Sequence, residues 1–203
     1  MSRKQSSVQK FIDHYLSKTF LRFIPNSVRP NHITVLRVLL TPVVYILLTR
    51  GQMLLGILLF VITAFTDALD GAMARTRNQI TNIGKVIDPL ADKLLILSVL
   101  AFIGFKYPII QVISIFIIFE MIAVAMGYVF SPVVGKPVGA NVFGKLKLIV
   151  QTIGVTLFLI GLLLNLDSLI DVSIWTLIIA MVLASLAALE VVRQKFLQVK
   201  QQY

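Results

Sequence analysis

The sequence predicts an all-α integral membrane protein with six transmembrane helices. Hydrophobic residues make up 58% of its 203 residues, and its mean hydropathy is +0.92, both well above the values of soluble domains. A helix needs about 20 apolar residues to cross the hydrocarbon layer. Stretches of that kind fill most of the chain, and we expect spans at residues 33–49, 53–75, 86–105, 109–130, 142–164 and 170–192.

An amphipathic segment precedes the first span. It mixes basic with apolar residues at helical spacing, among them Lys10, Phe11 and Leu16. This pattern is typical of a helix that lies on the membrane surface, and a helix packed on a partner protein is the alternative. We therefore expect residues 1–29 to form an amphipathic juxtamembrane helix and residues 30–203 to form the membrane domain.

Charge indicates the orientation of the spans. The net charge is +10, and the basic residues lie mainly beside the apolar stretches, where they set topology and attract anionic headgroups rather than nucleic acid. One set of flanks carries most of them, whereas the other offers only Arg50 and Lys106. The positive-inside rule then places both termini in the cytoplasm, and we expect a protein of a bacterial or archaeal cytoplasmic membrane.

Four of the nine acidic residues stand at the expected cytoplasmic ends of the second and third spans: Asp67, Asp70, Asp88 and Asp92. An ionised carboxylate at membrane depth costs several kcal/mol unless it is paired, hydrated or bound to a cation. The spacings of three and four residues put each pair on a single helix face. The clustering therefore indicates a functional site with a compensating charge.

Divalent cations are the natural compensating charge. The chain has no cysteine, which excludes thiolate zinc sites, disulfides and a cysteine nucleophile. An all-oxygen donor set favours Mg²⁺, Mn²⁺ or Ca²⁺, and two such ions balance four carboxylates. A metal pair of this kind clamps phosphate oxygens, as phosphoryl chemistry requires.

Small residues surround the aspartates. Gly71, Ala74 and Gly84 leave room for a bulky polar ligand, although close packing of helices is an equally good account of each alone. Arg75 is placed to reach a diphosphate; the alternative is a topology marker that extends to the interface.

The segment from Asp67 to Asp92 resembles the signature of the CDP-alcohol phosphotransferases, also called CDP-alcohol phosphatidyltransferases. That signature is D-x-x-D-G-x-x-A-R-x8-G-x-x-x-D-x-x-x-D, and every fixed position is present at the family spacing. The six-span layout agrees with it. Within the family, the segments Asp88 to Lys93 and Gly144 to Lys147 are most like those of bacterial phosphatidylglycerophosphate synthases.

The resemblance implies an activity and a set of site residues. It implies a homodimer that transfers a phosphatidyl group from CDP-diacylglycerol to an alcohol and releases CMP, with Mg²⁺ or Mn²⁺, two ions per protomer. Asp92 is the expected general base. The expected metal ligands are Asp67, Asp70, Asp88 and Asp92, and the expected CDP-binding residues are Asp67, Asp70, Gly71, Ala74, Arg75, Gly84, Asn31 and Thr34.

The acceptor is harder to predict. Phosphatidylglycerophosphate synthases, which use glycerol 3-phosphate, tend to carry an Arg-Glu pair on the fourth span and another arginine about two turns later, whereas this chain has Phe119-Glu120 and Gly127. Either Lys136, Lys145 and Lys147 hold the acceptor phosphate, or the acceptor is different. The alternatives are phosphatidylglycerol in a cardiolipin synthase, inositol phosphate, inositol or serine.

Glu120 stands alone among apolar residues, and we interpret it as bonded to a neighbouring span or a dimer partner rather than to substrate. Two other classes also place acids in an apolar chain. Intramembrane prenyltransferases usually carry their two aspartate motifs far apart, and an ion transporter spreads acids along a pathway, often over repeated halves. The compact stretch from Asp67 to Asp92 favours neither.

Overall fold

The computed structural model describes residues 15, 18–25, 28–77, 79, 84–129 and 142–200. In these residues the chain forms helices and no strand. A short 3₁₀ helix precedes a bundle of long α-helices. The elements are η1 (Leu21–Phe23), α2 (Pro30–Thr49), α3 (Met53–Thr76), α4 (Gly84–Gly104), α5 (Pro108–Val129), α7 (Val142–Leu164) and α8 (Asp167–Lys200).

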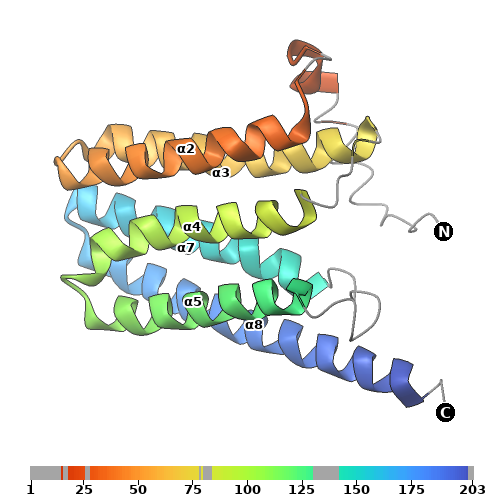
Figure 1. Ribbon diagram of the computed structural model, residues 1–203. Coiled ribbons are helices and arrows are strands. Elements are labelled where there is room, and N and C mark those ends of the chain that lie inside the picture. The colour runs from red at the N-terminus through yellow and green to blue at the C-terminus, as the bar shows by residue number, and fades with distance from the viewer. Residues whose placement is uncertain are drawn as a thin grey trace.

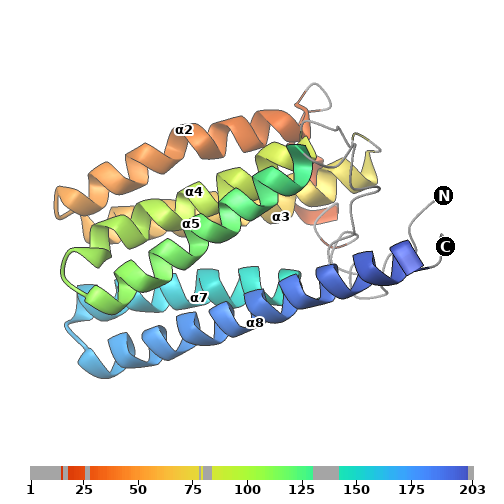
Figure 2. The same cartoon turned by 60° about the horizontal axis from the view of Figure 1, so that its bottom comes forward.

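The long helices run roughly along one direction (Figure 1). Helix α2 packs against both α3 and α4, and α4 in turn packs against α5. Helices α7 and α8 form a pair beneath the others (Figure 2) and contact α3, α4 and α5. The starts of α2 and α4 and the end of α3 lie at the same end of the bundle (Figure 1).

The all-helical class predicted from the sequence is confirmed, and each long helix coincides with an expected span to within a few residues. The main difference is α8, which continues to Lys200 beyond the expected end of the last span and runs past the end of α5 (Figure 1). In the described residues, four helices are long and apolar enough to cross a membrane: Pro30–Thr49, Met53–Thr76, Leu146–Leu164 and Asp167–Val191.

Short connections fix the pairing of successive helices. Between α2 and α3, Gly51 has a φ of 77°, and after α7, Asn165 has a φ of 54°. This left-handed conformation is the usual way to end a helix, and Gly and Asn are the residues that adopt it most readily. The α2–α3 and α7–α8 pairs are therefore tight hairpins.

Two glycines let α7 and α8 approach closely. A Cβ added at Gly154 would lie 2.9 Å from Leu177, and one added at Gly161 would lie 2.9 Å from Ile170. Lipid is as apolar as leucine, so helices in a membrane associate through close packing rather than through the hydrophobic effect. The glycines supply that packing along one face of α7.

Arg77, at the end of α3, binds the chain that leads into α2. Its guanidinium donates to four backbone carbonyls, those of Leu21, Ile24, Pro25 and Val28, at 2.8–3.3 Å. Much of the amphipathic segment expected at residues 1–29 lies outside the described residues, so that expectation stays a prediction. The described part includes η1, and Leu21 packs in a small cluster with Met73 of α3.

We expect Arg77→Ala to lower the free energy of unfolding by about 1–2 kcal/mol, because four carbonyls lose a charged donor at a half-buried position. Thermal unfolding in detergent micelles measures this, and limited proteolysis should show faster cleavage between Leu21 and Val28. Arg50→Ala is the matched control, since Arg50 is an exposed arginine at the opposite end of α2. Equal midpoints for the two variants would show that the contact contributes nothing.

Candidate functional site

The four aspartates of the motif come from two neighbouring helices. Asp67 and Asp70 lie in the second half of α3, and Asp88 and Asp92 lie in the first half of α4. Both stretches lie toward the end of the bundle where α2 begins (Figure 1). The structure brings the four carboxylates together around two side chains of α2, Thr34 and Arg37.

Arg37 lies between three of the carboxylates. Its side chain is 0% exposed. Nη2 donates to Asp70 Oδ2 at 2.5 Å, and Nη1 lies 3.4 Å from Asp67 Oδ1 and also pairs with Asp92 Oδ1. A single guanidinium therefore joins α2 to both α3 and α4, using the planar fork of donors that matches carboxylate geometry.

Thr34 contacts the fourth carboxylate. Its Oγ1 lies 2.8 Å from Asp88 Oδ1 and 3.3 Å from Asp70 Oδ2. A hydroxyl has one proton to donate, and the shorter contact assigns it to Asp88. The side chain sits one turn before Arg37 on the same buried face of α2.

From the sequence we expect Thr34 near the nucleotide, whereas no role is predicted for Arg37. The signal was present, because Arg37 stands alone among the apolar residues of the first span, where an ionisable side chain indicates function by default. Its partners are 30 to 55 residues away along the chain. Helical spacing cannot identify contacts of that range.

The chemistry of the donor set suits divalent metal ions. It offers four carboxylates, oxygen donors only, and one positive charge from Arg37, which leaves the cluster with excess negative charge. Within the described ranges, however, no three acidic or histidine side chains are grouped so as to hold a metal ion as they stand. Three of the carboxylates contact Arg37 instead, and Asp88 contacts Thr34.

The expected CDP-binding residues lie along the same end of the bundle. Gly71, Ala74 and Arg75 follow Asp70 on α3, Asn31 is in the first turn of α2, and Gly84 opens α4. A Cβ added at Gly71 would lie 3.1 Å from Arg75 Nη1. The missing side chain at Gly71 therefore leaves the space that the Arg75 guanidinium uses.

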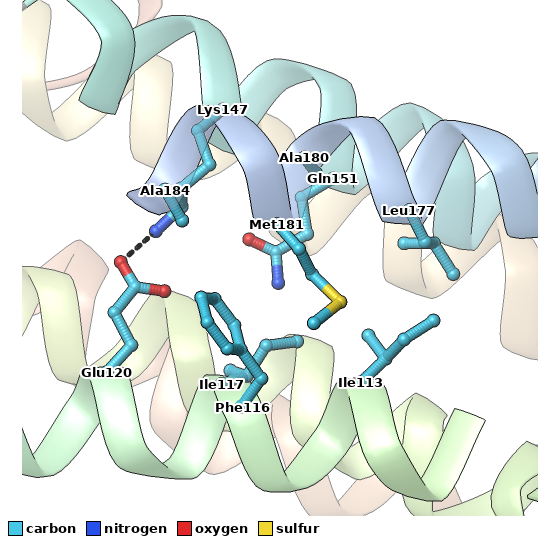
Figure 3. A pocket seen from close by; sticks show the side chains of 10 residues that line it. All are labelled: Ile113, Phe116, Ile117, Glu120, Lys147, Gln151, Leu177, Ala180, Met181 and Ala184. Atoms are coloured by element: carbon cyan, nitrogen blue, oxygen red, sulfur yellow. Dashed lines mark hydrogen bonds and ion pairs between the residues drawn. The ribbon is translucent and has the colours of Figure 1, made fainter. Parts of the chain in front are cut away.

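A second charged cluster joins α4, α5 and α7, and Figure 3 shows its Glu120–Lys147 pair. Glu120 of α5 pairs with Lys147 of α7, and its Oε1 lies 3.4 Å from Lys93 Nζ of α4. The lysine side chains are 8% and 9% exposed and the glutamate 25%. Our interpretation of Glu120 as bonded to a neighbouring span is confirmed. Two buried ammonium groups share one carboxylate, so the cluster has excess positive charge.

Of the three lysines expected at the acceptor, the structure places only Lys147. Lys136 and the side chain of Lys145 lie outside the described residues. The pocket beside Lys147 is mainly apolar, and Phe116, Gln151 and Met181 are among the residues that line it (Figure 3). Its free volume is about 10 Å³, room for about one water molecule. This conformation therefore holds no acceptor there.

The sequence of the chain is similar to sequences of known proteins. A sequence profile of the CDP-alcohol phosphatidyltransferase family matches residues 27–191. The chain belongs to this family. The transferase is therefore a member of a group of membrane enzymes that depend on divalent metal ions, and the resemblance expected from the motif is confirmed.

Individual relatives agree. The CDP-diacylglycerol–glycerol-3-phosphate 3-phosphatidyltransferase of Rickettsia typhi is 32% identical over 135 residues, which are 65% of this chain and 76% of the relative. The enzyme of the same name from Bacillus subtilis is 33% identical over 147 residues, 64% of this chain and 76% of the relative. A probable cardiolipin synthase (CMP-forming) of Drosophila melanogaster is 39% identical over 67 residues, 32% of this chain and 21% of the relative.

We expect Glu120→Gln in the transferase to lower the free energy of unfolding by about 3 kcal/mol, because it leaves two buried ammonium groups without a counter-charge. The double variant Glu120→Gln/Lys147→Met should regain much of that loss. Unfolding midpoints of both single variants and the double variant complete the cycle. Simple addition of the two single losses would contradict the pairing.

Proposed function

We propose that this transferase moves a phosphatidyl group from CDP-diacylglycerol to glycerol 3-phosphate, forming phosphatidylglycerophosphate and CMP. The relatives of that name in Rickettsia and Bacillus, each matched over about three quarters of its length, support this substrate pair. Membership of the family sets aside the prenyltransferase and transporter alternatives.

The single observation that carries the proposal is the convergence of the motif aspartates of α3 and α4 on one face of α2. Residues that are distant in sequence meet at one end of the bundle, beside the glycine and arginine that the family motif requires. We propose that Asp67, Asp70, Asp88 and Asp92 hold two Mg²⁺ or Mn²⁺ ions. Bound there, the ions supply charge neutralisation of the diphosphate and of the leaving CMP.

The remaining chemistry belongs to side chains of this chain. Asp92 accepts the proton of the acceptor hydroxyl, whose oxygen attacks the phosphorus that carries the lipid. The bond from that phosphorus to the bridging oxygen breaks, and CMP leaves with the bonding electrons. Arg75 faces the diphosphate, and Gly71 gives its guanidinium room to do so. Asn31, Thr34, Ala74 and Gly84 complete the proposed nucleotide site.

We assign the acceptor phosphate to basic residues that lie within the start of α7 or shortly before it in the sequence. We propose Lys147 together with Lys136 and Lys145. The excess positive charge of the buried Lys93–Glu120–Lys147 cluster supports a phosphorylated acceptor, because an incoming anion improves its charge balance. Lys93 directly follows Asp92 on α4, which puts this cluster and the base on adjacent residues of one helix.

A cardiolipin synthase is the second candidate. It uses the same chemistry with phosphatidylglycerol as the acceptor. Two observations favour it: the similarity to the Drosophila protein over 67 residues, and the presence of Phe119 and Gly127 where phosphatidylglycerophosphate synthases tend to carry arginines.

The membrane arrangement is also a proposal. Helices of 21 and 22 residues in α4 and α5 reach roughly 30 Å, the thickness of the hydrocarbon core. With them the chain crosses the bilayer six times, with both termini and the site at the cytoplasmic side, as the positive-inside rule predicts. We further propose a homodimer, which crosslinking in native membranes tests.

The acceptor is identified by CMP release from CDP-diacylglycerol. The full-length protein in detergent is given Mg²⁺ or Mn²⁺ and, in parallel, glycerol 3-phosphate, phosphatidylglycerol, serine, inositol or inositol phosphate. We expect metal-dependent release with glycerol 3-phosphate. Release with phosphatidylglycerol alone would establish the second candidate, and silence with every acceptor from a folded protein would refute the proposed activity.

We expect Asp92→Asn to reduce turnover by a factor of about 10² to 10⁴, because it removes the general base. Much of the metal and CDP binding should persist, since three carboxylates remain. Asp171→Asn, an exposed acid in α8, is the control and should turn over normally. Undiminished CMP release by Asp92→Asn would remove Asp92 from the mechanism.

A further inference from the structure

Arg37 occupies the centre of the aspartate cluster. Its guanidinium contacts Asp67, Asp70 and Asp92 at once, and its Nε donates to Thr66 Oγ1 at 3.4 Å. None of its side chain is exposed. The position is therefore built by three helices and is no surface ion pair.

Arg37 neutralises only part of the negative charge of the cluster. Arg37 brings one positive charge to a cluster that includes Asp88 as a fourth carboxylate, held by Thr34. Removing the partner of a buried charge is strongly destabilising, because it leaves that charge uncompensated. Arg37 is thus the charge that lets the carboxylates lie together before other cations arrive, and it leaves the cluster attractive to them.

A metal ion and this guanidinium compete for the same oxygens. Divalent ions take carboxylate oxygens at about 2.0–2.6 Å, and Arg37 Nη2 already lies 2.5 Å from Asp70 Oδ2. The same group engages Asp67 Oδ1 and Asp92 Oδ1. Like charges repel strongly in a medium of low dielectric constant. The guanidinium and a metal ion therefore compete at these atoms.

We propose that Arg37 is an internal counter-ion of the aspartate cluster, which divalent ions displace when they bind. This proposal rests on the metal-binding role proposed for the aspartates. Arg37 stabilises the transferase without metal and lowers its affinity for metal. It is a positioning residue, because it holds Oδ1, one of the two carboxylate oxygens of the proposed base Asp92.

The alternative to a counter-ion is a purely structural role, in which Arg37 helps the aspartates to bind metal. If Arg37 only held the aspartates in the geometry that metal requires, its loss would weaken metal binding. An internal counter-ion predicts the reverse sign, so the direction of the change decides between the two.

Arg37→Met is tested as full-length protein in detergent, without nucleotide. Mn²⁺ binding is measured from the electron paramagnetic resonance signal of free Mn²⁺, and thermal unfolding is measured in EDTA and in Mn²⁺. We expect at least about tenfold tighter Mn²⁺ binding, from the loss of one nearby positive charge. The midpoint should fall in EDTA and rise on adding Mn²⁺ by more than in the wild type.

Two further variants keep the test decisive. Arg37→Lys keeps the charge but lacks the planar fork of donors with which Arg37 contacts the three carboxylates. It should therefore fold, and bind Mn²⁺ a few-fold more tightly, if Arg37→Met does not fold. Thr34→Val alters the polar contacts of the aspartates without changing the charge, and should bind no more tightly than the wild type. Equal or weaker Mn²⁺ binding by folded Arg37→Met, or by Arg37→Lys in its place, overturns the proposal.

Asp70→Ala separates this failure from a failure of the proposed metal site. If Asp70→Ala loses Mn²⁺ binding while removal of Arg37 gives no gain, the metal site stands and the counter-ion role is overturned. If Asp70→Ala binds Mn²⁺ like the wild type, the proposed metal role fails, and the counter-ion role fails with it.

Discussion

The contact between Arg37 and three aspartates is the interaction on which the packing of α2, α3 and α4 depends at one end of the bundle. Elsewhere these helices meet through apolar side chains, whose association in lipid is only weakly directional. Three carboxylates in an apolar environment repel one another unless a positive charge lies between them. Arg37 of α2 contacts all three, which belong to α3 and α4. The contact therefore sets which faces of the three helices look inward.

Helix α4 contributes to two charged clusters, one with excess negative charge and one with excess positive charge. Asp92 belongs to the cluster around Arg37, and the next residue, Lys93, belongs to the cluster with Glu120 and Lys147. Consecutive residues point about 100° apart around a helix, so one turn of α4 serves both. A negative cluster suits cations, and a positive one suits phosphates. In the proposed reaction, both clusters lie within one helical turn of the proposed base, Asp92.

Much of the fold follows from local patterns, and the contacts within the site do not. Apolar stretches of membrane length predict the long helices, and the fixed positions from Asp67 to Asp92 predict which residues gather. Neither pattern predicts how α2 is rotated about its axis, so the contacts of Arg37 with the aspartates could not be predicted. The pairing of Lys147 with Glu120 was missed for the same reason. Such contacts depend on tertiary packing, which spacing within one helix does not contain.

The Arg77 contact has a consequence for where the site lies relative to the lipid. Irregular backbone is costly wherever water is scarce, because each unpaired carbonyl loses its hydrogen bond. Arg77 pairs with the carbonyl of Leu21 in η1 and with those of Ile24, Pro25 and Val28 between η1 and α2, so these four carbonyls do not need water as a partner. This stretch can lie at the depth of the lipid headgroups. At that depth the proposed CDP-linked lipid presents its diphosphate to the enzyme while its acyl chains stay in the membrane.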